Sequence, residues 1–256
     1  VIDQVTPNFV YNCAAEFGRW QGEKYYNNVW NTNVIGLKNI IQLQKECGFK
    51  LIHFSSSEVY GDYNDIMYED ILEQIPIKQL NDYALSKRVN ELQLENEAKM
   101  FSNKIEYVIV RLFNTYGPGE FYHPFRSVNC TFTYDLLHYK PITVYKGHKR
   151  TSTYIDDAVR TLANILNFTF RSGEIYNIGG GVLHTIEELA NYILKYTDRS
   201  SDLVRFNKSN EIQTTKIKMV DCSKAIRYLD HKITIGLEEG VKKTVEWMKE
   251  YYNVKD

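Results

Sequence analysis

Residues 1–120 alternate between short apolar stretches and two long stretches of helical character. The apolar stretches are of strand length and cover residues 8–15, 50–55 and 105–113. The long stretches, residues 25–47 and 80–100, have apolar side chains at helical spacing or alternating charges along an outer face. The order strand, helix, strand, helix, strand is typical of a parallel sheet with crossover helices. The sequence therefore predicts an α/β fold, in which ligands bind at the carboxyl ends of the strands.

Residues 121–256 contain shorter elements of both kinds. Helices are predicted at residues 129–138, 155–168, 185–196 and 237–252, and strands at residues 142–145 and 174–178. The third of these helices begins with a capping box, because Glu188 stands three residues after Thr185. Small, mixed elements of this kind are expected of a lid or a substrate-binding region.

Composition and charge exclude several classes of function. The formal net charge is −1, so no basic surface for nucleic acid is predicted. No apolar stretch reaches the length of about 18 residues that indicates a membrane span. The four cysteines are far apart, and neither they nor the six histidines have the spacing of metal ligands. These features predict a cytoplasmic protein with buried, reduced thiols and with no metal, nucleic-acid or membrane partner.

Two segments carry residues suited to proton transfer. Residues 55–58 (SSSE) end a predicted strand, and Tyr83 and Lys87 stand four residues apart on a predicted helix. Side chains at this spacing share one helix face, and an ammonium group beside a phenol lowers the pKa of the tyrosine. Tyr83 would then be a general base near neutral pH, with a serine hydroxyl on the same substrate oxygen. A solvated helix face would show the same tyrosine–lysine spacing, but serines at a strand end favour a site.

These segments and several others, in the same order, resemble the extended short-chain dehydrogenase/reductase family of nucleotide-sugar epimerases and dehydratases. The matching motifs are NCAA (12–15), TNVIG (32–36), SSSEVYG (55–61), YALSK (83–87), RLFNTYGPG (111–119), RTSTYIDD (150–157), IYNIG (175–179) and DCSKA (221–225). The resemblance implies a Rossmann-like, doubly wound parallel sheet with a smaller, mixed α/β C-terminal region. Residues 1–120 would be the remainder of the NAD-binding domain. Residues 121–256 would mainly bind a sugar nucleotide, with some segments returning to the first domain.

One part of the family pattern has no match. Family members open with a strand and a glycine-rich dinucleotide loop, and the three glycines at 179–181 stand too far along the chain to be that loop. The first strands of the sheet are therefore expected to be missing, with Val1 inside a connection. The resemblance implies NAD as the cofactor, but this chain is expected to bind it weakly or not at all.

The resemblance also implies a role for each matching residue. Tyr83 would remove a proton from the sugar 4-hydroxyl, Lys87 would hold the nicotinamide ribose, and Ser56 would bind the 4-oxygen. The cofactor-binding residues would be Ala14, Ala15, Asn33, Ser55, Tyr83, Lys87 and Leu112. The substrate-binding residues would be Ser57, Asn114, Arg126 and Arg150. Asn114 and Arg150 would hold the pyrophosphate, because a guanidinium group pairs with phosphate oxygens through its planar fork.

Glu58 distinguishes the reactions of the family. The 4,6-dehydratases have an acidic residue here that moves a proton from C5, and UDP-glucuronate decarboxylases also use a glutamate at this place. The triplet from Ser56 to Glu58 fits both, so the resemblance implies 4,6-dehydratase or decarboxylase chemistry on a nucleoside-diphosphate hexose or hexuronate. A 4-epimerase, which needs only the serine and the tyrosine, is the alternative within the family. A non-catalytic binding or scaffold protein is the alternative of another class.

Further expectations concern the dimer and substrate choice. Family members dimerise through two long helices, so we expect a homodimer through the helices from Tyr25 to Cys47 and from Leu80 to Met100. The segment at residues 16–24 is unusual: either Arg19 and Trp20 influence which sugar is bound, or the segment is a packed surface loop. The family commonly has an arginine upstream of its DxSKA motif. The corresponding residues 211–218 contain no arginine, and a lysine at 216 or 218 would replace it.

Overall fold

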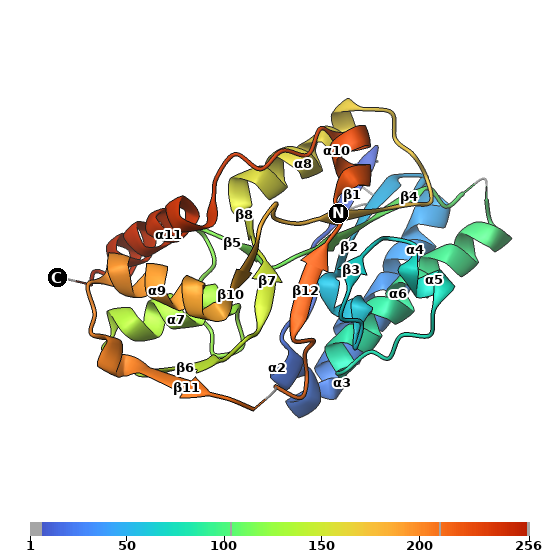
Figure 1. Ribbon diagram of the computed structural model, residues 1–256. Helices are drawn as coiled ribbons and strands as arrows, with labels where there is room; N and C mark the ends of the chain where they lie inside the picture. The colour runs from blue at the N-terminus through green and yellow to red at the C-terminus, as the bar shows by residue number, and fades with distance from the viewer. Residues whose placement is uncertain (1–6, 103, 210, 255–256) are drawn as a thin grey trace.

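The main sheet consists of four parallel strands in the order β1-β2-β4-β9 (Figure 1). The computed structural model describes residues 7–102, 104–209 and 211–254, so the expectation about Val1 lies outside the described residues. The strands of the sheet are β1 (Phe9–Asn12), β2 (Lys50–Ser56), β4 (Tyr107–Leu112) and β9 (Glu174–Ile178). The predicted parallel sheet is confirmed, and the carboxyl ends of its strands lie along one edge.

The two crossover connections between β1, β2 and β4 are helical, as predicted. The first connection contains α2 (Arg19–Lys24), α3 (Tyr26–Val29), a π-helical segment (Trp30–Ile35) and α4 (Gly36–Cys47). The second contains the short helix α5 (Ile71–Gln74) and the long helix α6 (Asp82–Met100). The π-helical segment was not predicted, because apolar spacing does not distinguish it from an α-helix. Gly48 ends α4 in the left-handed region, with φ of 73°, where glycine has no steric penalty.

Both faces of the main sheet are covered by helices. Alternate strand residues contact α4 and α6 on one face; among them are Leu51, Tyr107 and Ile109. The intervening residues contact α8 (Ile155–Asn167) and α10 (Ser223–Leu229) on the other face; among them are Ile52, Val108 and Val110. Strand β9 and helices α8 and α10 therefore return from the second half of the chain to the first sheet (Figure 1). The division at residue 120 stays a prediction.

A second unit lies to the left in Figure 1 and contains most of the later elements. Its helices are α7 (Val128–Leu137), α9 (Ile186–Thr197) and α11 (Leu237–Tyr251), which share one apolar cluster. Strands β6 (Ile142–Tyr145) and β11 (Val204–Asn207) pair beside them. The predicted capping box of α9 is confirmed, because Thr185 Oγ1 accepts from the Glu188 N–H at 3.0 Å and Glu188 accepts from the Thr185 N–H at 2.6 Å.

Short strands connect the two units. The sheet β10-β7-β12-β3 contains β10 (Leu183–Thr185), β7 (Lys149–Thr151), β12 (Ile217–Val220) and β3 (Ile66–Met67). A further pair consists of β5 (Thr115–Tyr116) and β8 (Thr153–Tyr154), and 3₁₀ turns occupy Ser57–Tyr60 and Ser201–Leu203. Since β3 follows β2 closely in the chain and β12 comes from the far end, this sheet brings distant side chains to the carboxyl edge of β2.

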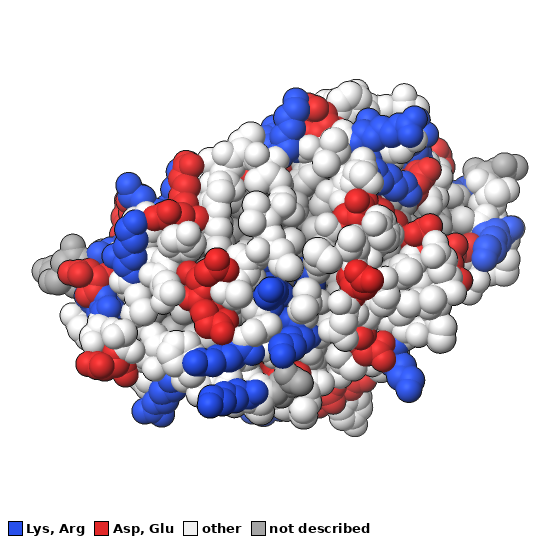
Figure 2. Space-filling view, in the orientation of Figure 1, with Lys and Arg blue, Asp and Glu red and all other residues white. Residues whose placement is uncertain are grey.

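The burial of the thiols differs in part from the prediction, whereas the distribution of surface charge agrees with the composition. All four cysteines are free, but the prediction that they are buried holds only for Cys130; Cys13 is exposed, and Cys47 and Cys222 are half-buried. Acidic and basic side chains are interspersed over the face that Figure 2 shows, as the net charge of −1 suggests. Among the described residues no helix is long and apolar enough to cross a membrane, and no group of three or more His, Cys, Asp or Glu residues could hold a metal ion.

Candidate active site

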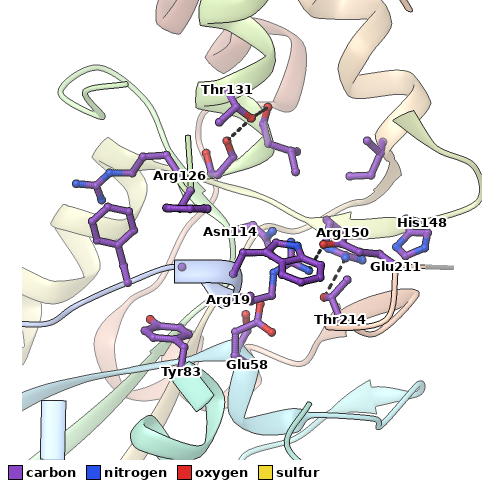
Figure 3. Close-up of a pocket in the computed structure, with 18 of the residues that line it drawn as sticks. Arg19, Glu58, Tyr83, Asn114, Arg126, Thr131, His148, Arg150, Glu211 and Thr214 are labelled. Atoms are coloured by element: carbon purple, nitrogen blue, oxygen red, sulfur yellow. Dashed lines mark hydrogen bonds and ion pairs between the residues drawn. The ribbon is translucent and has the colours of Figure 1, made fainter. Parts of the chain in front are cut away.

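A cavity of about 410 Å³ lies between the carboxyl edge of the main sheet and the second unit (Figure 3). Its volume is in the range of small-molecule sites. The predicted site residues that line it are Ser56, Ser57, Glu58, Tyr83, Leu112, Asn114, Arg126 and Arg150. The other predicted site residues, Ala14, Ala15, Asn33, Ser55 and Lys87, do not line this cavity. Tyr83 and Glu58 lie on the sheet side of the cavity, opposite Thr131 of α7 (Figure 3).

Ser56 and Tyr83 meet at one side of this cavity. Ser56 is the last residue of β2, and Tyr83 lies in the first turn of α6. The start of α6 is set by Asn81, whose side chain accepts a hydrogen bond of 2.8 Å from the Ala84 N–H. The Ser56 hydroxyl is near enough to the Tyr83 phenol to lower the pKa of that phenol. The two groups that the sequence assigned to one substrate oxygen therefore lie together at the wall of the cavity.

Lys87 is placed differently from the sequence expectation. Its ammonium group is buried and donates a hydrogen bond of 2.8 Å to the Phe54 carbonyl of β2, and it lies 5.8 Å from the centroid of the Tyr83 ring. The pKa of Tyr83 is raised to about 12, mainly by burial; the Ser56 hydroxyl opposes this shift, and the negative charge of Glu58 adds to it. The predicted lowering of the Tyr83 pKa by Lys87 is therefore wrong in this structure. Helical spacing placed the two side chains on one face, but the lysine reaches toward β2.

Glu58 forms an ion pair with a lysine from the far end of the chain. Lys218 lies on β12, is 2% exposed, and places its Nζ atom 2.5 Å from Oε1 of Glu58. Burial raises the pKa of the Glu58 carboxyl, but the charges of Lys218, Arg19 and Arg150 outweigh this effect and hold the pKa below its ordinary value. Glu58 is therefore an anion inside the cavity.

Arginines give part of the cavity a positive character. Arg150 is buried, and its guanidinium donates to the Lys149 carbonyl at 2.7 Å and to Thr214 Oγ1 at 3.3 Å (Figure 3). Burial lowers the pKa of Arg150 to about 10, so it stays charged near neutral pH. Arg126 lies over the Phe17 ring at 3.8 Å from its centroid. Planar cations held in this way suit phosphate oxygens.

Two residues of this region were not fully predicted from the sequence: Glu120 was not predicted at all, and the contact of Lys218 was not foreseen. Glu120 lines the cavity and accepts hydrogen bonds from the Ser127 N–H at 3.2 Å and from its hydroxyl at 2.9 Å, while burial raises the pKa of the Glu120 carboxyl. No sequence signal marked it, because it lies in a loop without a motif. Lys216 or Lys218 was expected to replace an arginine, and the pairing of Lys218 with Glu58 was not predicted. The sequence feature that could have indicated a buried, paired lysine is its position between apolar residues in the strand IKMV (217–220).

The predicted cofactor residues come from several elements, among them the end of β2, which holds Ser55, and the π-helical segment, which holds Asn33. Asn33 is buried and bonded to the backbone of Glu16 and to Ser86 Oγ, the latter at 2.9 Å. The Ser55 hydroxyl donates to Glu91 at 2.6 Å. These polar groups are occupied within the protein, so their contact with a cofactor stays a prediction.

Lys87, unlike Asn33 and Ser55, has hydrogen-bonding capacity left for the ribose of a nicotinamide cofactor. Among the described residues its ammonium group has one hydrogen-bond acceptor, the Phe54 carbonyl, so two further N–H bonds remain available. Burial lowers the pKa of Lys87 to about 8, as expected of a buried cation without a carboxylate in direct contact. A pair of ribose hydroxyls would supply the acceptors that are missing.

Comparison with known proteins identifies the family to which the chain belongs. A sequence profile described as the NAD dependent epimerase/dehydratase family matches residues 1–179. The chain belongs to this family. The family uses NAD, and its members related to this chain include epimerases, dehydratases and decarboxylases of nucleotide sugars. The resemblance inferred from the eight motifs is therefore confirmed.

Individual members of the family show the extent of the similarity. UDP-glucuronate 4-epimerase of Thermodesulfobacterium geofontis is 31% identical over 235 residues, which cover 87% of this chain and 68% of the relative. UDP-N-acetyl-alpha-D-glucosaminuronate decarboxylase of Bacillus cytotoxicus is 30% identical, with 95% and 77% covered. The structure of UDP-glucuronic acid 4-epimerase from Bacillus cereus with UDP-glucuronic acid and NAD matches with a TM-score of 0.85 and 26% identity, covering 98% of this chain and 77% of that one. This match confirms the predicted Rossmann-like α/β fold.

Proposed function

We propose that the protein oxidises C4 of a nucleoside-diphosphate hexose or hexuronate with NAD, and then eliminates water or carbon dioxide from the 4-keto sugar. The meeting of Ser56 and Tyr83 at the wall of the cavity carries this proposal. It places a base and a hydrogen-bond donor where one sugar hydroxyl can meet both. NAD, when bound, would accept the hydride from C4 and return it later in the reaction.

Separate residues of this chain would transfer the proton, bind the sugar oxygen and hold the cofactor ribose. Tyr83 would take the proton of the 4-hydroxyl, and Ser56 would donate a hydrogen bond to the same oxygen. Burial raises the pKa of Tyr83, and the Ser56 hydroxyl opposes that effect. Lys87 would hold the nicotinamide ribose through its two available N–H bonds. Ser57 and Leu112, which line the cavity, would border the sugar and the nicotinamide.

The arginines would bind the nucleotide end of the substrate. Arg150, Asn114 and Arg126 line the cavity, with Arg126 and Arg150 on different sides of it in Figure 3. Arg150 is fixed by its bonds to backbone carbonyls and to Thr214. A guanidinium fixed in this way loses little freedom on binding a pyrophosphate.

Glu58 supports a step that follows oxidation. It is an anion held in the cavity, and a carboxylate there could accept a proton from the carbon next to a 4-keto group. Two of the relatives described above are named for UDP-linked uronates, which agrees with a hexuronate substrate.

A nucleotide-sugar 4-epimerase is the second candidate. The ion pair with Lys218 gives Glu58 a position inside the protein that needs no reaction at C5 to explain it. An epimerase would use only Ser56 and Tyr83. The name of the relative from Thermodesulfobacterium geofontis is consistent with this candidate.

A homodimer through the two crossover helices is part of the same proposal. Leu85 and Leu92 of α6 are 39% and 40% exposed, and Ile35, which precedes α4, is 54% exposed. Leu85 and Leu92 stand two helical turns apart and share one face. Contact of this face with a second copy of the chain would bury these side chains.

Product analysis tests the proposed function. The full-length protein is incubated with NAD and with hexoses and hexuronates linked to UDP, GDP, CDP or dTDP, and the products are identified by proton NMR. We expect either a C6 methyl doublet, which shows loss of water, or a pentose, which shows loss of carbon dioxide. An inverted C4 would establish the epimerase candidate instead. If every sugar nucleotide stays unchanged, the proposed oxidation at C4 is wrong.

A further inference from the structure

Lys218 contacts Glu58 from behind the cavity wall, does not itself line the cavity, and lies outside every motif that the sequence shares with the family. It is the second residue of β12, which pairs with β7 on one side and β3 on the other. Pairing on both sides fixes the backbone, and Lys218 stands in register with Arg150. Its side chain is 2% exposed and ends 2.5 Å from Glu58. A buried lysine is costly unless it is paired, so its presence here calls for a specific role.

Charged groups from several elements face Glu58. They are Lys218 from β12, Arg19 from α2 and Arg150 from β7, and the titratable but neutral phenol of Tyr83 from α6 also faces Glu58. Arg19 is paired with Glu211 at 2.7 Å, and Arg150 donates to carbonyl groups and to Thr214. Among the residues that the structure describes, Lys218 is the cation that forms an ion pair with the Glu58 carboxylate. It is therefore the group best placed to set the charge and the position of Glu58.

We propose that Lys218 is a positioning residue that keeps the carboxylate of Glu58 ionised and directed at C5 of the sugar; this inference rests on the proposed function. In the 4-keto intermediate, Glu58 takes the proton from C5. The electron pair of the C5–H bond becomes the C4–C5 double bond of an enolate. The negative charge moves to the oxygen on C4, which Ser56 and Tyr83 bind.

Electrostatics explains why such a partner is needed. Burial is the largest influence on Glu58 and acts to raise the pKa of its carboxyl, which would leave it protonated and unable to act as a base. The charge of Lys218 is the largest opposing influence. Burial lowers the pKa of Lys218 itself to about 8, while Glu58 opposes that change, so each group supports the charged form of the other.

The direct test is a titration of Glu58, followed by carbon-13 NMR of glutamate side chains and assigned with the Glu58→Gln variant. In the wild-type protein we expect a midpoint below that of ordinary glutamates. In Lys218→Met the midpoint should rise by about one pH unit or more, because an adjacent opposite charge shifts a carboxyl by about 1–3 units. Lys218→Arg should keep the low midpoint. Lys224→Met is the matched control, since Lys224 pairs with Glu174 at the same distance of 2.5 Å outside the cavity.

The outcomes separate this inference from the proposed function. A Glu58 midpoint that is the same in wild type and in folded Lys218→Met overturns the role of Lys218, and Lys218→Gln gives the same comparison if the methionine variant does not fold. With a sugar nucleotide that the protein oxidises, exchange of the C5 hydrogen with D₂O should fall at least tenfold in Lys218→Met and return in Lys218→Arg. Unchanged exchange would overturn the role at C5. If no sugar nucleotide is oxidised, the proposed function fails, while the titration still decides whether Lys218 controls Glu58.

Discussion

Replacing Tyr83 with phenylalanine should lower kcat about a thousandfold and leave the fold unchanged. The phenolic oxygen is the base in the proposed oxidation, and a positioned base contributes roughly 10²–10⁴ in rate. The ring itself stays in place, because phenylalanine has the same shape and lacks only the hydroxyl that lies near Ser56. The measurement is kcat with the sugar nucleotide that the product analysis identifies, together with a circular dichroism spectrum.

Tyr116→Phe is the matched control for this prediction. Tyr116 is also buried and also makes a hydrogen bond, to the Leu237 carbonyl at 3.3 Å, but it does not line the cavity. Its replacement should leave kcat within about threefold. A Tyr83→Phe protein that is equally active would show that another group takes the proton from the sugar.

The second large effect is on stability and concerns Arg111 on β4. Its guanidinium is 1% exposed and forms two hydrogen bonds of 2.9 Å with Glu91 of α6. It also donates to Tyr60 Oη at 2.8 Å. Removing the charge of Glu91 in Glu91→Gln leaves a buried guanidinium without its counter-ion, which costs about 3–5 kcal/mol. We therefore expect the free energy of unfolding in urea to fall by about 3 kcal/mol or more.

An exposed ion pair provides the comparison for Glu91. Lys242 and Glu246 lie on the surface of α11 at 3.8 Å, and both side chains are more than half exposed. Pairs of this kind contribute about 0–1 kcal/mol, so Glu246→Gln should change the free energy of unfolding by less than about 0.5 kcal/mol. A loss smaller than about 1 kcal/mol in Glu91→Gln would mean that Arg111 finds water or another acceptor.

Much of the fold could be predicted because its elements have local patterns. Strands Ile142–Tyr145 and Glu174–Ile178 agree with the predicted ranges, and the capping box at Thr185 forms as predicted. Apolar spacing and side-chain-to-backbone capping depend on neighbours in the chain, so one sequence contains enough information. The placement of Ser56 beside Tyr83 was also predictable, because parallel strands and their crossover helices bring these positions to one edge.

The electrostatic part of the site could not be predicted in the same way. Lys218 and Glu58 are separated by 160 residues, and their contact depends on β12 entering a sheet beside β3. The direction of the Tyr83 pKa shift depends on burial and on which way Lys87 points, and residue spacing shows neither. Distant pairing and burial are properties of the assembled fold.

The central claim is that hydride leaves C4 of the sugar in the site that contains Ser56 and Tyr83. A single turnover of the full-length protein with NAD and a sugar nucleotide deuterated at C4 tests it most directly, with the cofactor analysed by mass spectrometry after quenching. We predict that deuterium is found on the nicotinamide during turnover and that the rate of its appearance falls in Tyr83→Phe. Product formation with no deuterium on the nicotinamide at any time would contradict the account.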